Sequence, residues 1–198
     1  VVDRFDLAAE PNEPNRFGWI VEVDPFTKSS TPVKHTMLGR FKHECATTVL
    51  ARDGRVVVYM GDDQQFEYFY KFVSRGRFDP ARPDANRDLL DEGTLYVARL
   101  DDDGRGEWLP LVHGEHPELT AERGFASHGD VVLRCREAAD RLGATPLDRP
   151  EDVAVNPNDG HLFIVNGTGN SSGGGALGAA IVETDSTGTQ IFSTISLP

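Results

Sequence analysis

The sequence predicts an all-β fold, and three features of the chain carry that prediction. Short runs rich in β-branched and aromatic residues alternate with turn residues along most of the 198 positions. Two of these runs are joined through Asp53-Gly54, a dipeptide that favours a tight hairpin. The same order of charged corner, strand, Asp-Gly turn and strand returns around Asp159-Gly160. Units of four strands with such hairpins are typical of propeller blades, so we expect a β-propeller.

Several strands are expected in the first part of the chain, after a loop at residues 1–16. They are Trp19–Asp24, Val33–Leu38, Ala46–Leu50, Arg55–Met60 and Phe66–Val73. Pro25 closes the first of them, because proline has no N–H to donate to a ladder. Val56–Met60 is apolar on both faces, as expected of a strand buried between two layers. In the last run, three aromatic residues share one face, namely Tyr68, Tyr70 and Phe72.

The middle of the chain is expected to hold a surface excursion followed by a hairpin. Residues 75–92 are polar and include prolines, Thr94–Leu100 is a strand, and Trp108–Val112 is its return strand. The acidic stretch 101–104 between them lacks the ligand spacing of a calcium loop. It is better explained as a hairpin turn.

One helix is expected near residues 128–142. Apolar residues recur there at three- and four-residue spacing. Ser127 can cap the first turn, and Gly143 ends the helix. We expect this helix to contribute packing rather than chemistry.

The last part of the chain is expected to form a second four-stranded unit. Its strands are Val153–Val155, His161–Val165, Ala180–Thr184 and Gln190–Ile195. The Gly/Ser-rich tongue Gly167–Gly178 has no lysine and does not lead from a strand into a helix, so it is not a phosphate-binding P-loop. Closing a propeller needs about four to eight blades. Two blades and an extra hairpin therefore predict that residues 1–198 form an incomplete arc of a larger ring.

The composition excludes some classes of partner. The chain has 20 Lys and Arg against 32 Asp and Glu, a formal charge of −12, which argues against binding to nucleic acids or anionic membranes. It fits a periplasmic or secreted protein, or one that binds hard cations. No signal segment precedes the first strand, and no run approaches the roughly 18 apolar residues of a membrane span. Cys45 and Cys135 can pair or remain free thiols.

A dense group of charges at residues 39–44, which we call the charged segment, lies directly before a predicted strand. Arg149-Pro150-Glu151-Asp152 is a partial echo before another predicted strand. The first strand of a blade lines the central channel, so the carboxylates of Glu44, Glu151 and Asp152 would converge and repel unless a cation offset their charge. Calcium or another hard metal is the predicted ligand, and Lys42 or Arg40 could hold an anion such as phosphate on it. Two solvated loop corners remain the simpler alternative.

Beyond these patterns, the sequence resembles the PhoX-type alkaline phosphatases, a bacterial family, from about residue 15 to residue 157. The stretches that carry the resemblance are Asn15–Pro25, Leu38–Glu44, Val58–Asp63, Phe66–Ser74, Gly93–Leu100 and Ala138–Asp152. After Pro157 the resemblance fades, and the divergent blade at residues 158–198 is similar to a generic NHL-type propeller blade.

The resemblance implies a β-propeller phosphatase, exported to the periplasm, that hydrolyses small phosphomonoesters with an iron–calcium cluster in the channel. It implies that Glu44 is a metal ligand and that Lys42 contacts the phosphate. Glu151 and Asp152 lie in the family's Arg-Pro-Glu-Asp motif, and either of them can be the ligand. The segments that supply the family's cysteine ligand lie upstream of this sequence, so Cys45 is not that cysteine.

The chain is therefore expected to be a fragment that holds part of a metal site. A second hypothesis remains open at this point. A non-catalytic propeller module could bind calcium, a glycan or a protein through the same acidic surface.

Overall fold

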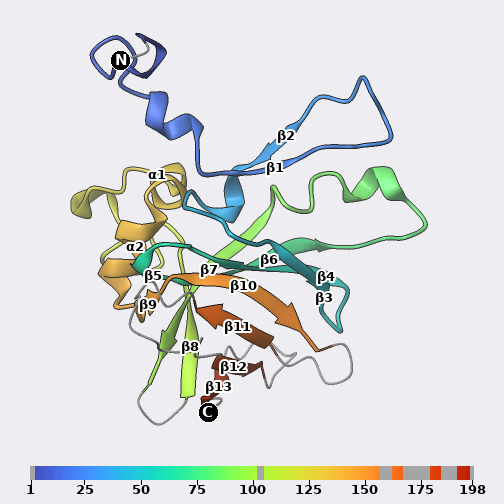
Figure 1. Ribbon diagram of the computed structural model, residues 1–198, viewed down its shortest axis with the longest axis vertical. Coiled ribbons are helices and arrows are strands. Elements are labelled where there is room, and N and C mark those ends of the chain that lie inside the picture. The colour runs from blue at the N-terminus through green and yellow to red at the C-terminus, as the bar shows by residue number, and fades with distance from the viewer. Residues whose placement is uncertain (1–2, 102–104, 157–161, 167–178, 184–190, 197–198) are drawn as a thin grey trace, which may run out of the picture.

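The computed structural model describes residues 3–101, 105–156, 162–166, 179–183 and 191–196 (Figure 1). Antiparallel strands dominate this part of the chain, so the all-β prediction is confirmed. The described strands are β1 (Ile20–Glu22), β2 (Val33–His35), β3 (Thr47–Leu50), β4 (Arg55–Gly61), β5 (Gln65–Glu67), β6 (Phe69–Arg77), β7 (Gly93–Leu100), β8 (Arg105–Pro110), β9 (Leu147–Asp148), β10 (Pro150–Val155), β11 (Leu162–Asn166), β12 (Ala179–Glu183) and β13 (Ile191–Ser196). The described α-helices are α1 (His128–Leu133) and α2 (Cys135–Leu142).

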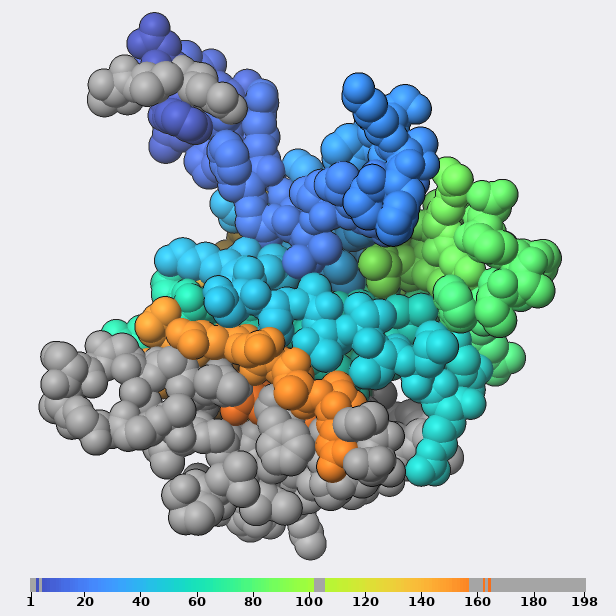
Figure 2. Space-filling model, turned by 45° about the vertical axis from the view of Figure 1, so that its right-hand side comes forward, coloured from blue at the N-terminus to red at the C-terminus, as the bar shows by residue number. Residues whose placement is uncertain are grey.

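The main described sheet consists of two antiparallel meanders that correspond to two blades. β3, β4, β6, β7 and β8 form the first meander, and β10 to β13 form the second. The outer strands β8 and β13 pair with each other, while β10 lies against β3 and β4. Across this inner contact the Thr47 hydroxyl donates to the Val153 carbonyl at 2.6 Å. Figure 2 shows the orange band of residues 150–156 along the cyan residues that include β3 and β4.

β6 separates two apolar clusters because both of its faces are buried. Tyr70 and Phe72 face the cluster that also contains side chains of both helices. Phe69 and Val73 face the cluster shared with β10 and β11. Tyr68 lies in the first cluster as well, so the predicted face of Tyr68, Tyr70 and Phe72 is confirmed. Aromatic burial on both faces makes β6 the central strand of this part of the fold.

The predicted helix is interrupted at Arg134, which has φ −116° and ψ 41°. Its predicted ends are confirmed: the Ser127 hydroxyl accepts the N–H of Asp130, and Gly143 ends α2 in the left-handed region at φ 71°. The interruption removes one turn of the helical ladder. The Val132 carbonyl instead accepts the N–H of Arg40 at 3.0 Å, which joins the helices to the charged segment.

Several strand boundaries differ from the prediction. β2 ends at His35 and continues as a 3₁₀ turn at Thr36–Leu38. The run Phe66–Val73 is divided at Tyr68, between β5 and β6. β5 carries Phe66 at φ 66° and pairs with β9. β8 ends at Pro110, earlier than the predicted return strand. Asp159-Gly160, residues 102–104 and the tongue at 167–178 lie outside the described residues.

A further correction concerns Arg149–Asp152, which we call the second charged motif. Glu151 and Asp152 lie within β10, not before it. The register between β10 and β11 shifts between Pro150 and Val153, so the two carboxylates occupy an irregular part of the strand. In the part of the chain that the structure describes, no helix has the length and apolar character of a membrane span.

Candidate active site

The charged segment begins at a turn that requires glycine. Gly39 has φ 82°, and a Cβ there would lie 2.8 Å from Leu95 Cδ2. Directly after it, the Arg40 guanidinium donates to two backbone carbonyls of the N-terminal region, Phe17 at 3.0 Å and Pro14 at 2.7 Å. These bonds hold the N-terminal region against the start of the charged segment.

Side chains alternate in direction along the rest of the charged segment. Phe41 is buried, and the His43 ring stacks on it with centroids 3.7 Å apart. Phe41 in turn stacks on Tyr70 at 4.3 Å. His43 Nε2 donates to the Gly39 carbonyl at 3.0 Å, and burial lowers the pKa of His43 to about 4. Since this neutral stack occupies the inner side, Lys42 and Glu44 are exposed on the other side.

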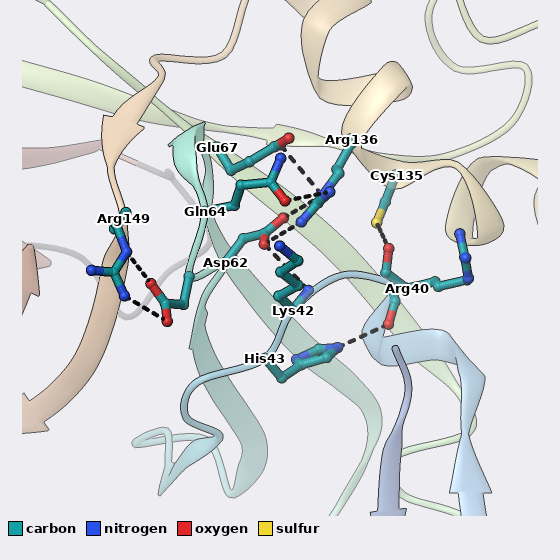
Figure 3. A network of polar contacts seen from close by, with 11 residues as sticks. Arg40, Lys42, His43, Asp62, Gln64, Glu67, Cys135, Arg136 and Arg149 are labelled. Carbon is teal, nitrogen blue, oxygen red and sulfur yellow. Dashed lines mark hydrogen bonds and ion pairs between the residues drawn. The ribbon is translucent and has the colours of Figure 1, made fainter. Parts of the chain in front are cut away.

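Two hydrogen bonds hold the backbone of Lys42, which lies beside Asp62 and Arg136 (Figure 3). Its N–H donates to Asp62 Oδ1 at 3.2 Å, and its carbonyl accepts the N–H of Asp63 at 3.0 Å. The N–H of Glu44 donates to the Gly61 carbonyl at 3.3 Å. The end of β4 therefore sets the position of both exposed side chains.

Asp62 is fully buried and is paired with Arg136 of α2. The guanidinium donates from Nε to Oδ2 and from Nη2 to Oδ1, both at 2.7 Å, which is the bidentate geometry of a strong ion pair. Burial raises the pKa of Asp62, while Arg136 opposes that shift. Arg136 also donates to Gln64 at 3.4 Å and lies 3.5 Å from Glu67. Burial raises the pKa of Glu67 to about 7.

A pocket of about 260 Å³ opens beside Lys42. Its lining combines three cationic residues with an aromatic and glycine wall, namely Arg40, Lys42, Arg136, Phe17, Gly18 and Phe41. Arg40 and Arg136 are engaged with backbone carbonyls and with Asp62, whereas no ion pair within the described residues involves Lys42. The ammonium group of Lys42 is thus the cation best placed to meet an anionic ligand.

The second charged motif contacts Asp63, the residue that also binds the Lys42 carbonyl. Arg149, at φ 53°, contacts both carboxylate oxygens of Asp63, at 2.8 and 3.1 Å, and Glu151 Oε1 at 3.1 Å. The Cys45 thiol donates a hydrogen bond to the Glu151 carbonyl, with the sulfur and oxygen 3.3 Å apart. Asp152 is exposed, and one of its oxygens accepts the N–H of Val153 at 2.8 Å. The two motifs therefore lie next to each other, through Arg149 with Asp63 and through Cys45 with Glu151. The predicted convergence of the Glu44, Glu151 and Asp152 carboxylates stays a prediction.

The predicted site residues do not complete a metal centre by themselves. Within the described residues no three or more His, Cys, Asp or Glu side chains are grouped as metal ligands. In the same part of the chain, the Glu44 side chain makes no hydrogen bond or ion pair, so its carboxylate is available. Cys45 and Cys135 are free thiols, which settles whether they pair.

Two residues of this cluster had no role assigned from the sequence. Asp62 belongs to a stretch that carries the family resemblance, but its partner is 74 positions away. Arg136 lies in the helix to which only packing was attributed. No local pattern distinguishes Arg136 from the neighbouring Arg134 and Arg141, because only the tertiary fold brings it to Asp62, the residue after β4.

Comparison with known proteins extends the likeness along the chain. The family model for alkaline phosphatase PhoX matches residues 2–194, beyond the stretch 15–157. The solved structure of Pseudomonas fluorescens PhoX in complex with vanadate, described as a transition state analogue, has 43% sequence identity and a TM-score of 0.87. The match covers 97% of this chain and 37% of that chain, and it confirms the predicted propeller architecture. No curated protein matches. The chain belongs to the PhoX alkaline phosphatase family.

Proposed function

We propose that the protein hydrolyses small phosphomonoesters and that this chain supplies the cation that contacts the phosphoryl group, Lys42. The observation that carries the proposal is the exposed Lys42, whose backbone N–H and carbonyl are bound by Asp62 and Asp63 and whose side chain lines a cationic pocket. A relative of 43% identity binds vanadate, an analogue of a phosphoryl transition state. A cation whose backbone is held next to the pocket would stabilise the charge that develops on the transferred group.

We further propose that Glu44, together with Glu151 or Asp152, contributes oxygen ligands to calcium and iron. The donor set fits hard cations, because carboxylate oxygens are their preferred ligands. Glu151 shares its charge with Arg149, whereas Glu44 and Asp152 are exposed, which favours Glu44 and Asp152. When bound, the metals would supply Lewis-acid activation of the phosphoryl group. The remaining ligands would come from other parts of the protein, since this chain spans 37% of the PhoX chain that it matches.

The acidic composition supports a location outside the cytoplasm for this proposal, as does the exported family that the sequence resembles. We expect a small-molecule substrate and no nucleic acid or membrane partner, because a net charge of −12 repels polyanions.

The test is hydrolysis of 4-nitrophenyl phosphate at alkaline pH, with calcium and iron supplied. Lys42→Met should lower kcat/KM by about a hundredfold, since one preorganised contact to the transition state is lost. Lys28→Met removes an exposed lysine from a loop away from the pocket and should leave kcat/KM unchanged. Unchanged activity in Lys42→Met would refute the assignment of Lys42, and an inactive wild-type protein with its metals bound would refute the function.

The second candidate is a non-catalytic calcium-binding propeller module. It is favoured by one observation, the net charge of −12, which suits the binding of hard cations through an acidic surface. Metal analysis of the purified protein separates the two candidates. Bound iron together with calcium supports the phosphatase, whereas calcium alone supports the module.

A further inference from the structure

The position of Arg136 suggests more than packing, because it neutralises the carboxylate that lies nearest to the backbone of Lys42. Asp62 accepts the Lys42 N–H and both arms of the Arg136 guanidinium. The Asp62 side chain is fully buried, and the Arg136 side chain is 30% exposed. A buried carboxylate with no charged partner is strongly unfavourable. Asp62 therefore needs a cation, and Arg136 is the one that it has.

Lys42 is the other cation within reach. Its charge opposes the rise that burial causes in the pKa of Asp62, although less than Arg136 does. Figure 3 shows the Lys42 side chain on the same side of the cluster as Asp62 and Arg136. No ion pair joins Lys42 to Asp62 within the described residues, where the guanidinium occupies both carboxylate oxygens. Without Arg136, the flexible Lys42 side chain could turn back to Asp62 and neutralise it.

We propose that Arg136 is a positioning residue that occupies Asp62 and thereby keeps the Lys42 ammonium free for a phosphoryl anion in the adjoining pocket. Asp62 has two separate roles in this arrangement. Its Oδ1 holds the Lys42 backbone, and its charge anchors Arg136 rather than attracting the Lys42 side chain. The inference rests on the proposed function only in taking a phosphoryl group as the anion that Lys42 meets.

The first experiment measures the binding of orthophosphate and vanadate to the purified, metal-loaded protein, together with KM and kcat. In Arg136→Gln the affinity for both anions should fall on the order of tenfold, because the strength of one charge-assisted contact is lost. KM should rise by a similar factor. The control is Arg141→Gln, which removes an arginine of the same helix that pairs with Glu137 at 3.0 Å. It should leave anion affinity unchanged.

The decisive variant is the pair Asp62→Asn with Arg136→Gln. Asparagine keeps an oxygen to accept the Lys42 N–H but carries no charge to capture the ammonium. The double variant should therefore recover most of the anion affinity that Arg136→Gln alone loses. If the double variant binds anions as weakly as Arg136→Gln does, Arg136 acts as a charge in the pocket and the proposal is wrong.

A double-mutant cycle with Lys42→Gln keeps the proposal testable if the Asn variant folds poorly. Should Arg136 act through Lys42, Arg136→Gln has no further effect on anion affinity once Lys42 is absent. Additive losses would overturn the proposal. Wild-type protein that binds metals and orthophosphate but hydrolyses no phosphomonoester would refute the proposed function while leaving this binding test valid.

Discussion

Glu67, beside Arg136, is a side chain whose protonation the fold changes. It lies at the end of β5 with 16% of its side chain exposed, 3.5 Å from Arg136. Burial is the main reason that its pKa rises to about 7, and the charges of Asp62 and Asp140 add to the rise. Arg136 and Lys42 act in the opposite direction but do not cancel it. The folded protein therefore binds a proton there more tightly than the unfolded chain does.

This difference predicts a pH dependence of stability. Because the folded pKa of Glu67 lies above its ordinary value of 4.5, its favourable contribution is complete below about pH 4.5 and is lost as the pH rises through about 7. Glu67→Gln should therefore raise the free energy of unfolding at pH 8 by on the order of 2 kcal/mol and change it little at pH 4. Urea unfolding at both pH values measures this. The exposed-helix variant Glu137→Gln should show no such pH-dependent gain, and an equal gain at both pH values would contradict the prediction.

At the scale of elements, the contact between β4 and β10 depends on the absence of one side chain. A Cβ on Gly61 would lie 2.2 Å from the Pro150 carbonyl oxygen and 2.5 Å from that of Glu151. Both obstacles are backbone atoms, which cannot move without separating the strands. The end of β4 and the second charged motif can therefore lie together only because residue 61 is glycine.

Gly61→Ala should consequently be strongly destabilising. Forcing β10 away from β4 loses the packing between the two meanders, and we expect a loss of about 3 kcal/mol in the free energy of unfolding. Gly129→Ala in α1 is the matched control. Its Cβ would meet only the Ser127 hydroxyl at 3.4 Å, and alanine favours a helix, so stability should stay the same or rise slightly. Thermal unfolding measures this difference, and similar midpoints for the two variants would contradict the prediction.

Across the whole molecule, β3 and β4 of the first meander and β10 of the second bring their charged motifs next to each other. The hairpin of β1 and β2 stands apart from them. Figures 1 and 2 show β1 and β2 rising from the body of the molecule. The hairpin is tied to the body through His35, which is buried between Glu22 at 3.1 Å and Asp91 at 2.9 Å. The site therefore depends on how separate parts of the chain are assembled rather than on any single hairpin.

The proposed ligation of metals by Glu44 and Asp152 predicts that metal removal destabilises the protein. Carboxylates that converge without a cation repel one another, so a chelator should lower the thermal midpoint of the metal-loaded protein by several degrees, on the order of 1 kcal/mol. Combining Glu44→Gln with Asp152→Asn should reduce this response. Glu92→Gln, which removes one partner of an exposed ion pair with Arg75, should leave the response to the chelator unchanged. An equal chelator response in both variants would argue against Glu44 and Asp152 as ligands.

Local features of the fold could be predicted from the sequence because they depend on neighbouring residues. The Asp53-Gly54 hairpin joins β3 to β4, Ser127 caps α1, and Gly143 ends α2, as expected. The alternation in β6 correctly separated Phe69 from Tyr70. Family membership was also recognisable from the sequence, because its motifs are contiguous stretches.

Only the tertiary structure decided which charges meet. Nothing near Arg136 in the sequence identifies Asp62 as its partner, and no local pattern marks the break at Tyr68 between β5 and β6 or the interruption at Arg134. Periodicity records which face of a segment is buried, but not which distant segment covers it. The sequence by itself determined most strands, the family and the charged segment, while the pairing of Arg136 in α2 with Asp62 and the contact of β10 with β4 were decided only by the fold, because the residues that meet are far apart in the sequence.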